Sequence, residues 1–195
     1  MENRIPITSE IANSAVSSGL RGAGVVLTGS ALVAVCSHIS VPLWFTPVPL
    51  TLQPFAVLLL GLVLSPRLAA ATLGAYLLEG AAGLPVFTPG FALGTGLAHL
   101  FGPTGGYLMS YPAAAGLVSW LRRRLDRGFA GDMLSAAMGD AVILLCGFVW
   151  LATWTRISAG SAFAMAVLPF LPGEALKVVA AAGISRGLAR ARRNQ

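Results

Sequence analysis

Charged residues are scarce in this chain of 195 residues: they make up 10% of it, and lysine occurs only once, at position 177. A soluble domain carries about 25% charged residues, so a soluble fold of this length could not cover its surface. With 56% hydrophobic residues and a mean hydropathy of +0.79, the composition predicts an integral membrane protein.

Motifs for several kinds of chemistry are missing as well. The sequence has no G-x-x-x-x-G-K-[ST] phosphate loop, which excludes ATP binding of that kind, and no G-x-S-x-G or H-E-x-x-H motif. The two cysteines, Cys36 and Cys146, lie in apolar runs and are expected to be free thiols. His38 and His99 are solitary, and we expect capping or interfacial roles rather than metal binding. The first twenty residues lack a continuous apolar stretch, so we expect no cleavable signal peptide.

Apolar segments divide the chain into spans. A spanning helix needs about 20 apolar residues, and candidates cover 22–39, 51–64, 68–82, 104–121, 133–154 and the chain from 172 onward. The second and third are short, and merging them would leave five spans. We predict an all-α bundle of six transmembrane helices with ordered outer loops. Residues 1–21 would be an N-terminal cytoplasmic segment, 22–190 the membrane domain and 191–195 a basic tail.

The distribution of positive charge tests the number of spans, because arginine and lysine concentrate on the cytoplasmic side of membrane proteins. If the N-terminus is cytoplasmic, six spans leave Arg156 outside, Lys177 within a helix and eleven of the thirteen cations inside: Arg4, Arg21, Arg67, Arg122, Arg123, Arg124, Arg127, Arg186, Arg190, Arg192 and Arg193. Six spans are therefore favoured, with both termini in the cytoplasm. Basic clusters beside spans are typical contacts for anionic lipid, so the net charge of +6 does not indicate nucleic-acid binding.

Four ionisable residues fall inside or at the ends of the predicted spans: Glu79, Asp140, Glu174 and Lys177. Such residues are costly in a membrane, and each is a candidate site residue. Glu174 and Lys177 are three residues apart in the stretch PGEALK, so they share a helix face, and Pro172 fits the first helical turn. They could form a self-satisfied ion pair or face a ligand. We favour the ligand, because a lysine near the positive end of a helix is misplaced unless an anion is present.

A second polar cluster precedes the fourth predicted span, in the stretch GPTGGY. Gly105 and Gly106 permit close approach to the backbone, Thr104 can cap the helix, and Tyr107 offers a ring with a hydroxyl group. The prolines of TPVPLT, residues 46–51, predict a rigid extended loop, which Gln53 follows. All these elements share the outer side, which predicts a small-molecule pocket that opens outward.

Small residues recur at helical spacing, a pattern that lets membrane helices approach closely. Packing inside the bundle and docking onto another membrane protein are both compatible with these pairs, which are Ser30 with Ala34, Ala70 with Gly74, Ala71 with Ala75, and Gly183 with Gly187.

Four stretches in order resemble the BioY family: PVPLTLQ (47–53), LSPRLAAATLGAYLLEGAAGLPVF (64–87), FGPTGGYLMSYP (101–112) and LPGEALK (171–177). The resemblance covers about residues 22–190. That family comprises the biotin-specific substrate-binding subunits of energy-coupling-factor (ECF) transporters. It implies a multi-pass protein of the bacterial cytoplasmic membrane that binds biotin near the outer surface and carries no cofactor. It also implies partners, namely a transmembrane coupling subunit and ABC-type ATPases.

The resemblance extends to residues. It assigns Glu174 and Lys177 to the biotin site, where the family's usual acid is aspartate, and it matches Ser30 and Ala34 to the alanine-x-x-x-alanine pattern with which the first helix docks onto the coupling subunit. Glu174 would accept a ureido N–H group, and Lys177 would balance the ligand's negative charge. The rings of Phe87 and Tyr107 would pack on the bicyclic ring of biotin. The candidate substrate-binding residues are Glu174, Lys177, Tyr107, Gly106, Gly105, Thr104, Phe87, Thr88 and Asp140.

The predicted function is high-affinity biotin binding and uptake, as the substrate-specific subunit of an ECF-type transporter. The alternative is a stand-alone secondary transporter of biotin or a related vitamin, with Asp140 as the proton site. A membrane-embedded enzyme that uses Glu79, Asp140 or Glu174 is disfavoured, because the sequence shows no nucleophile–base pair.

Overall fold

The computed structural model describes residues 7–89, 96–126 and 128–194, with side chains from Gly19 onward. These residues form helices joined by short connections, which confirms the predicted all-α class; the one sheet is a pair of two-residue strands, β1 (Ser40–Val41) and β2 (Leu50–Thr51). The helices are α1 (Ile7–His38), α2 (Gln53–Val63), α3 (Pro66–Ala81), α4 (Leu97–Leu100), α5 (Gly105–Arg124), α6 (Phe129–Thr155), α7 (Ala159–Ala166) and α8 (Leu171–Arg193).

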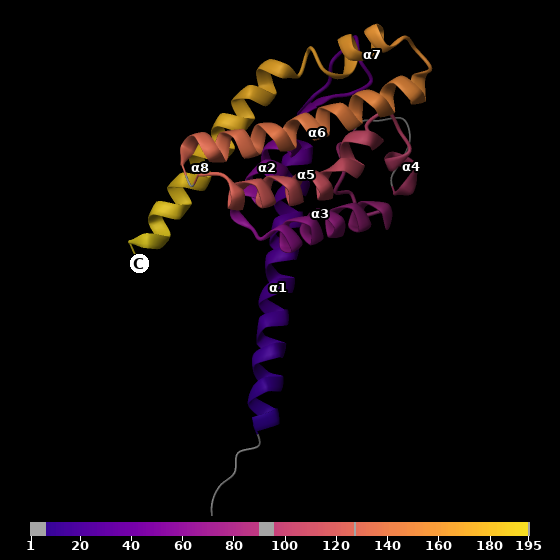
Figure 1. Cartoon of the computed structure of the whole chain (residues 1–195). Coiled ribbons are helices and arrows are strands. Elements are labelled where there is room, and N and C mark those ends of the chain that lie inside the picture. Colours follow the sequence, from indigo (N-terminus) through magenta and orange to yellow (C-terminus); the bar gives the residue numbers. More distant parts are fainter. Residues whose placement is uncertain (1–6, 90–95, 127, 195) are drawn as a thin grey trace, which may run out of the picture.

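The long helices form one bundle (Figure 1). Helix α5 lies between α3 and α6, and α2 packs against α5, α6 and α8. Helix α1 crosses these helices at a steep angle and contacts α3 and α2, while its N-terminal part extends well beyond the bundle. The apolar core lies where α2, α3, α5 and α6 face one another.

Length and apolar composition identify fewer spans than were predicted. Among the described residues, Gly19–His38 of α1 and the whole of α6 are each long and apolar enough to cross a membrane, and α7 with α8 forms a third candidate that bends by 48°. Helix α2 has only 11 residues and α3 has 16, so they could cross only with the help of their flanking residues. The number of six spans therefore stays a prediction.

Proline starts three of the helices. Pro54, Pro66 and Pro172 each occupy one of the first two positions of α2, α3 and α8, where the missing N–H group costs nothing. The structure thereby confirms the expected place of Pro172. The Oγ atom of Ser158 caps α7 by accepting a hydrogen bond from the N–H group of Ser161 at 3.2 Å.

Helix boundaries differ from the prediction at both ends of the chain. Helix α1 begins at Ile7 rather than at 22, and α8 continues through most of the segment assigned to the tail, because a polar helix can continue into water beyond the bilayer. Helices α4 and α7 lie in segments where only loops were expected. Both are too short to show the 3.6-residue periodicity that identifies a helix from sequence.

The predicted rigid loop at 46–51 is one arm of a hairpin. Ser40 pairs with Thr51 and Val41 with Leu50 in an antiparallel register, and the N–H group of Leu52 donates to the Ile39 carbonyl at 3.0 Å. The hairpin brings its second strand to the start of α2. At its far side Trp44 is 96% exposed.

The small-residue pairs separate into two kinds. Ser30 is buried and donates through Oγ to Glu79 Oε1 at 2.9 Å, so it joins α1 to α3 inside the bundle. This corrects the matching of Ser30 to an outward docking face, since its side chain is already engaged. At Gly183 and Gly187, by contrast, an added Cβ atom would meet nothing within 4 Å, so this pair does not pack inside the bundle.

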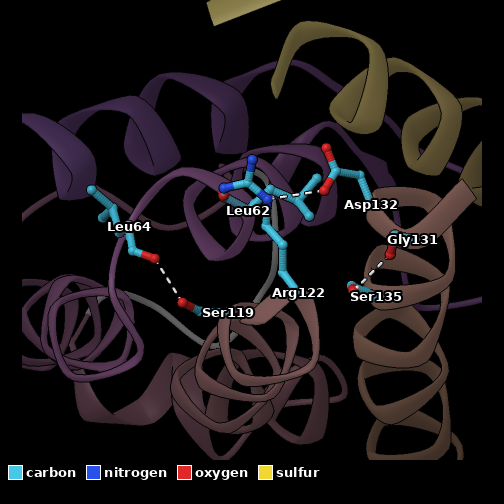
Figure 2. A network of polar contacts seen from close by, with 7 residues as sticks. All are labelled: Leu62, Leu64, Ser119, Arg122, Gly131, Asp132 and Ser135. Carbon is cyan, nitrogen blue, oxygen red and sulfur yellow. Dashed lines mark hydrogen bonds and ion pairs between the residues drawn. The ribbon is translucent and has the colours of Figure 1, made fainter. Parts of the chain in front are cut away.

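A polar network ties together the arginine-rich ends of the helices (Figure 2). Arg122 on α5 donates through Nε to Oδ1 of Asp132 on α6 at 2.9 Å, and its guanidinium also donates to the Leu62 carbonyl at the end of α2. Ser119 donates to the Leu64 carbonyl at 2.6 Å. Because Asp132 is only 1% exposed, its charge depends on Arg122 for compensation.

Removing Arg122 should therefore destabilise the bundle. The variant Arg122→Gln leaves the Asp132 carboxylate buried without its cation, a change that costs about 3–5 kcal/mol in folded proteins. Thermal unfolding of the detergent-solubilised protein measures the loss. Arg123→Gln, an exposed neighbour on the same helix, is the matched control and should unfold like the wild type. Equal stability of the two variants would contradict the structural role of Arg122.

Candidate substrate-binding site

A small cavity lies where the first turns of α2, α5 and α8 meet. The hairpin, α4 and the middle of α6 complete its wall, which consists of Val48, Pro49, Thr51, Gln53, Pro54, Thr88, His99, Thr104, Tyr107, Leu108, Tyr111, Ile143, Leu144, Phe170 and Glu174. The elements predicted to line an outward pocket do converge, and α2 and α4 join them. The volume is about 40 Å³, which is room for about three water molecules at most.

Glu174 supplies the carboxylate of the cavity wall. Its side chain is 6% exposed, and its Oε1 atom accepts a hydrogen bond from Nζ of Lys177 at 2.6 Å. The shared helix face predicted from the i, i+3 spacing is confirmed, and on it the two residues form the ion pair that was the disfavoured alternative. The other oxygen of Glu174, Oε2, is buried and has no hydrogen-bond partner among the described residues.

Asp140 on α6 belongs to the same buried group of charges. It is 6% exposed and interacts electrostatically with both Glu174 and Lys177. Lys177 forms its ion pair with Glu174, and Asp140 lies close enough to interact with both charges. Burying charges is costly unless they are paired and hydrogen-bonded, so a group that holds one cation for two acids is well suited to receive a further hydrogen-bond donor.

Gln53 is the centre of the uncharged polar wall. Its amide Nε2 donates to the hydroxyl of Tyr76 at 2.5 Å, while its Oε1 atom accepts from Thr51 and Thr88, both at 3.3 Å, and from Tyr111 at 3.5 Å. The Tyr76 hydroxyl in turn donates a hydrogen bond to the Val86 carbonyl at 2.9 Å. Gln53 thereby holds the hairpin, α3 and α5 around one side of the cavity.

Tyr107 lines the cavity with its ring, and its hydroxyl donates to the Ala166 carbonyl at 2.7 Å, at the end of α7. Thr104 also reaches the cavity. It occupies the N-cap position of α5, but its side chain makes no capping hydrogen bond, which corrects the predicted cap: Thr104 has helical dihedral angles, and capping requires an extended residue.

Phe87 and the glycines lie behind the wall rather than in it. Phe87 is 7% exposed, stacks on His99 with ring centres 5.1 Å apart, and meets Tyr76 edge-on at 5.5 Å. Gly105 faces the Leu100 carbonyl, and Gly106 faces Trp150 and the Cys146 carbonyl. In the structure these glycines therefore allow α5 to pack closely against other segments of the protein.

The two histidines have different surroundings. His38 is exposed, and its Nδ1 atom lies 2.8 Å from the Ala34 carbonyl at the end of α1, as a capping or interfacial residue would. His99 is 6% exposed and lines the cavity, so the interfacial one of its two predicted roles is wrong: its ring is covered because α4 folds it against Phe87. A four-residue helix gives no sequence signal for such burial.

Sequence reasoning assigned no site role to Gln53 or Tyr111, although signals for both were present. Gln53 is a lone amide at the head of an apolar run, and Tyr111 lies four residues after Tyr107, on the same helix face. Polar groups in a membrane helix need partners, so both residues predict buried hydrogen bonds, but the sequence does not show which groups they meet.

Comparison with known proteins agrees with this architecture. The sequence profile of the BioY family matches residues 9–194. A Pyrococcus horikoshii protein named "Probable biotin transporter BioY" is 41% identical over 81% of this chain and 90% of its own length. The "Biotin transporter BioY" of Thermotoga maritima is 34% identical, over 80% of this chain and 88% of its own. The "Biotin transporter BioY2" of Lactococcus lactis is 33% identical over 79% and 82%.

The fold has a counterpart among solved structures. A crystal structure at 2.1 Å of the S-component for biotin from an ECF-type ABC transporter matches with a TM-score of 0.81, covering 89% of this chain and 93% of that chain. The sequences are 24% identical, and at that level the match establishes the fold.

The family profile spans nearly the whole described chain, and relatives above 30% identity cover most of it. Their names are those of transporters. The chain belongs to the BioY family, and it is a transport protein rather than an enzyme.

Proposed function

We propose that the chain binds biotin in the cavity beside Glu174 and delivers it across the cytoplasmic membrane as the substrate-specific subunit of an ECF-type transporter. The observation that carries this proposal is the Glu174 carboxylate, which lines the cavity with one oxygen bonded to Lys177 and the other without a partner among the described residues. The names of the relatives supply the identity of the ligand.

The chemistry of biotin suits these groups. Its ureido ring has two N–H donors and one carbonyl acceptor, and its valerate chain ends in a carboxylate. The free oxygen of Glu174 accepts a ureido N–H group, while Lys177 remains bonded to the other oxygen. The opposite orientation, with the valerate carboxylate against Glu174, would place like charges together.

The remaining candidates then divide by distance from the ligand. Tyr107 and Thr104 contact biotin directly, and Thr88 does so from the Gln53 network. Asp140 acts through Glu174, Phe87 supports the wall from behind, and Gly105 with Gly106 sets how closely α5 approaches α6. Because the cavity holds only about 40 Å³, its elements must move apart to admit the bicyclic ring.

The transport step needs partners. The phosphate-loop motif is absent from the sequence, so a transmembrane coupling subunit and ABC-type ATPases supply ATP hydrolysis. With both termini in the cytoplasm, the cavity opens outward. Helices α5 and α8 run from the cavity to the arginine-rich ends, and the 20 residues of α5 separate these ends by about 30 Å.

Biotin binding should depend on Glu174 and Lys177. Glu174→Gln removes the charged acceptor and should weaken binding by about 10- to 100-fold, the value of a hydrogen bond to a charged group. Lys177→Ala should weaken it strongly as well, because two buried carboxylates lose their common cation. Titration calorimetry of the detergent-solubilised chain measures the affinities.

Glu79→Gln is the matched control for this experiment. It makes the same chemical change in a carboxylate of α3 that bonds to Ser30 away from the cavity, and it should leave affinity unchanged. Mass spectrometry of the wild-type protein from biotin-containing medium should recover about one biotin per chain. Wild-type affinity in both Glu174→Gln and Lys177→Ala would refute the proposed site.

The source of energy separates this proposal from a stand-alone secondary transporter. Uptake of labelled biotin should require co-expressed ATPase and coupling subunits and should persist in Asp140→Asn cells at a reduced rate. Uptake by the chain alone that collapses with an uncoupler, and is abolished in Asp140→Asn, would instead identify a proton-coupled transporter.

A further inference from the structure

A second hollow lies at the opposite end of the bundle from the cavity, where α2, α5 and α8 end. We call it the arginine groove. It encloses about 900 Å³, near the upper end of the range of about 300–1,000 Å³ typical of small-molecule sites. Six arginines line it, and none of its described lining residues is acidic: Arg122, Arg123, Arg186, Arg190, Arg192 and Arg193.

The cations are arranged by the fold rather than gathered in a tail. Arg186, Arg190 and Arg193 are spaced i, i+4, i+7, so they share one face of α8, and that face is turned toward the ends of α2 and α5. Attraction to the helix dipole accounts for arginines in the last turn only. Arg186 lies about two turns before the end of α8, beyond the reach of that effect.

Asp132, an acid beside the groove, is already engaged. Asp132 bonds to Arg122, whose guanidinium also donates to the Leu62 carbonyl (Figure 2). Within the described chain, Arg190, Arg192 and Arg193 make no ion pair or hydrogen bond. Several like charges around one hollow repel one another, and an anion seated among them would relieve that repulsion.

The level of the groove relative to the membrane indicates the source of the anion. Ile184 and Leu188, on the other side of α8 at the same height, are 45% and 44% exposed, as lipid-facing side chains are. Trp120 at the end of α5 is 47% exposed and carries Arg124 over its ring at 5.0 Å. Exposed tryptophan and arginine together are typical of the membrane interface, so the groove lies at the level of the lipid headgroups.

We infer that the arginine groove binds the phosphate headgroup of an anionic phospholipid from the cytoplasmic leaflet. Basic pockets between transmembrane helices on that side are suited to such headgroups. The arginine groove is a pocket of this kind, because α5 and α8 supply its arginines and the end of α2 lies between them. A bound lipid would hold the ends of α2, α5 and α8 together by charge. The inference does not depend on which substrate the cavity takes.

Native mass spectrometry of the detergent-solubilised chain tests the inference, with palmitoyl-oleoyl phosphatidylglycerol and the phosphatidylcholine of the same acyl chains as probes. The phosphatidylglycerol should bind in preference. The triple variant Arg190→Gln, Arg192→Gln, Arg193→Gln should weaken its binding by about tenfold or more, since each basic residue near an anionic surface contributes several-fold.

The matched control removes three exposed cations outside the groove: Arg21→Gln, Arg67→Gln, Arg124→Gln. It has the same net charge as the groove variant and should bind phosphatidylglycerol within about twofold of the wild type. All six positions are exposed, and thermal unfolding checks that both variants are folded. The single variant Arg190→Gln repeats the test with the smallest change.

Three results would overturn the inference. An equal loss of phosphatidylglycerol binding in the groove and control variants would mean that diffuse surface charge, and not the groove, attracts the lipid. Equal binding of phosphatidylglycerol and phosphatidylcholine would mean no recognition of the headgroup charge. Displacement of the lipid by an equal concentration of inorganic phosphate would mean a site for a soluble anion.

Discussion

The need to pair every polar group inside a membrane governs how this bundle is held together. Without water, a donor or acceptor in the apolar interior must find its partner within the protein. Three such pairings each join different helices: Ser30 with Glu79 between α1 and α3, Gln53 with Tyr76 and Tyr111 between α2, α3 and α5, and Arg122 with Asp132 between α5 and α6. Apolar packing alone would not specify these registers, because lipid tails compete equally well for apolar faces.

The candidate site is one of the places where this pairing is left incomplete; the others among the described residues are Oδ2 of Asp132 and Oγ of Ser185. Glu174 and Lys177 satisfy each other within one helical turn, so their ion pair adds no link between helices. Oδ1 of Asp140 and Oε2 of Glu174 are buried without hydrogen-bond partners among the described residues. An unpaired buried acceptor is costly, and a ligand that donates to it recovers that cost. A transport protein gains selectivity from this arrangement, because a molecule without the matching donor leaves the acceptor unsatisfied.

The two ends of the bundle are built differently. Around the cavity, neutral amide, hydroxyl and aromatic groups surround one carboxylate, and such a wall recognises a small polar molecule by its hydrogen bonds. Around the arginine groove, the lining is cationic and wide. The same helices α2, α5 and α8 connect both ends, so a movement that opens the cavity at their first turns would also act on the ends that meet the headgroups.

Much of the site was predictable from local patterns. The spacing of Glu174 and Lys177 predicted a shared helix face, Pro172 predicted the start of α8, and the motif stretches indicated the family, because each depends on residues a few positions apart. The whole-chain composition likewise indicated the membrane class, since so few charges cannot cover a soluble surface, and the apolar segments indicated the all-α fold.

Contacts between distant segments were decided only by the tertiary structure. Gln53 collects hydroxyl groups from residues 23, 35 and 58 positions away, Ser30 turns inward because Glu79 of another helix meets it, and α4 brings His99 against Phe87. The arginines were visible as clusters, but their assembly around one groove depends on where three helices end. Sequence determines which groups need a partner, whereas the packing of the helices decides which partner each group meets.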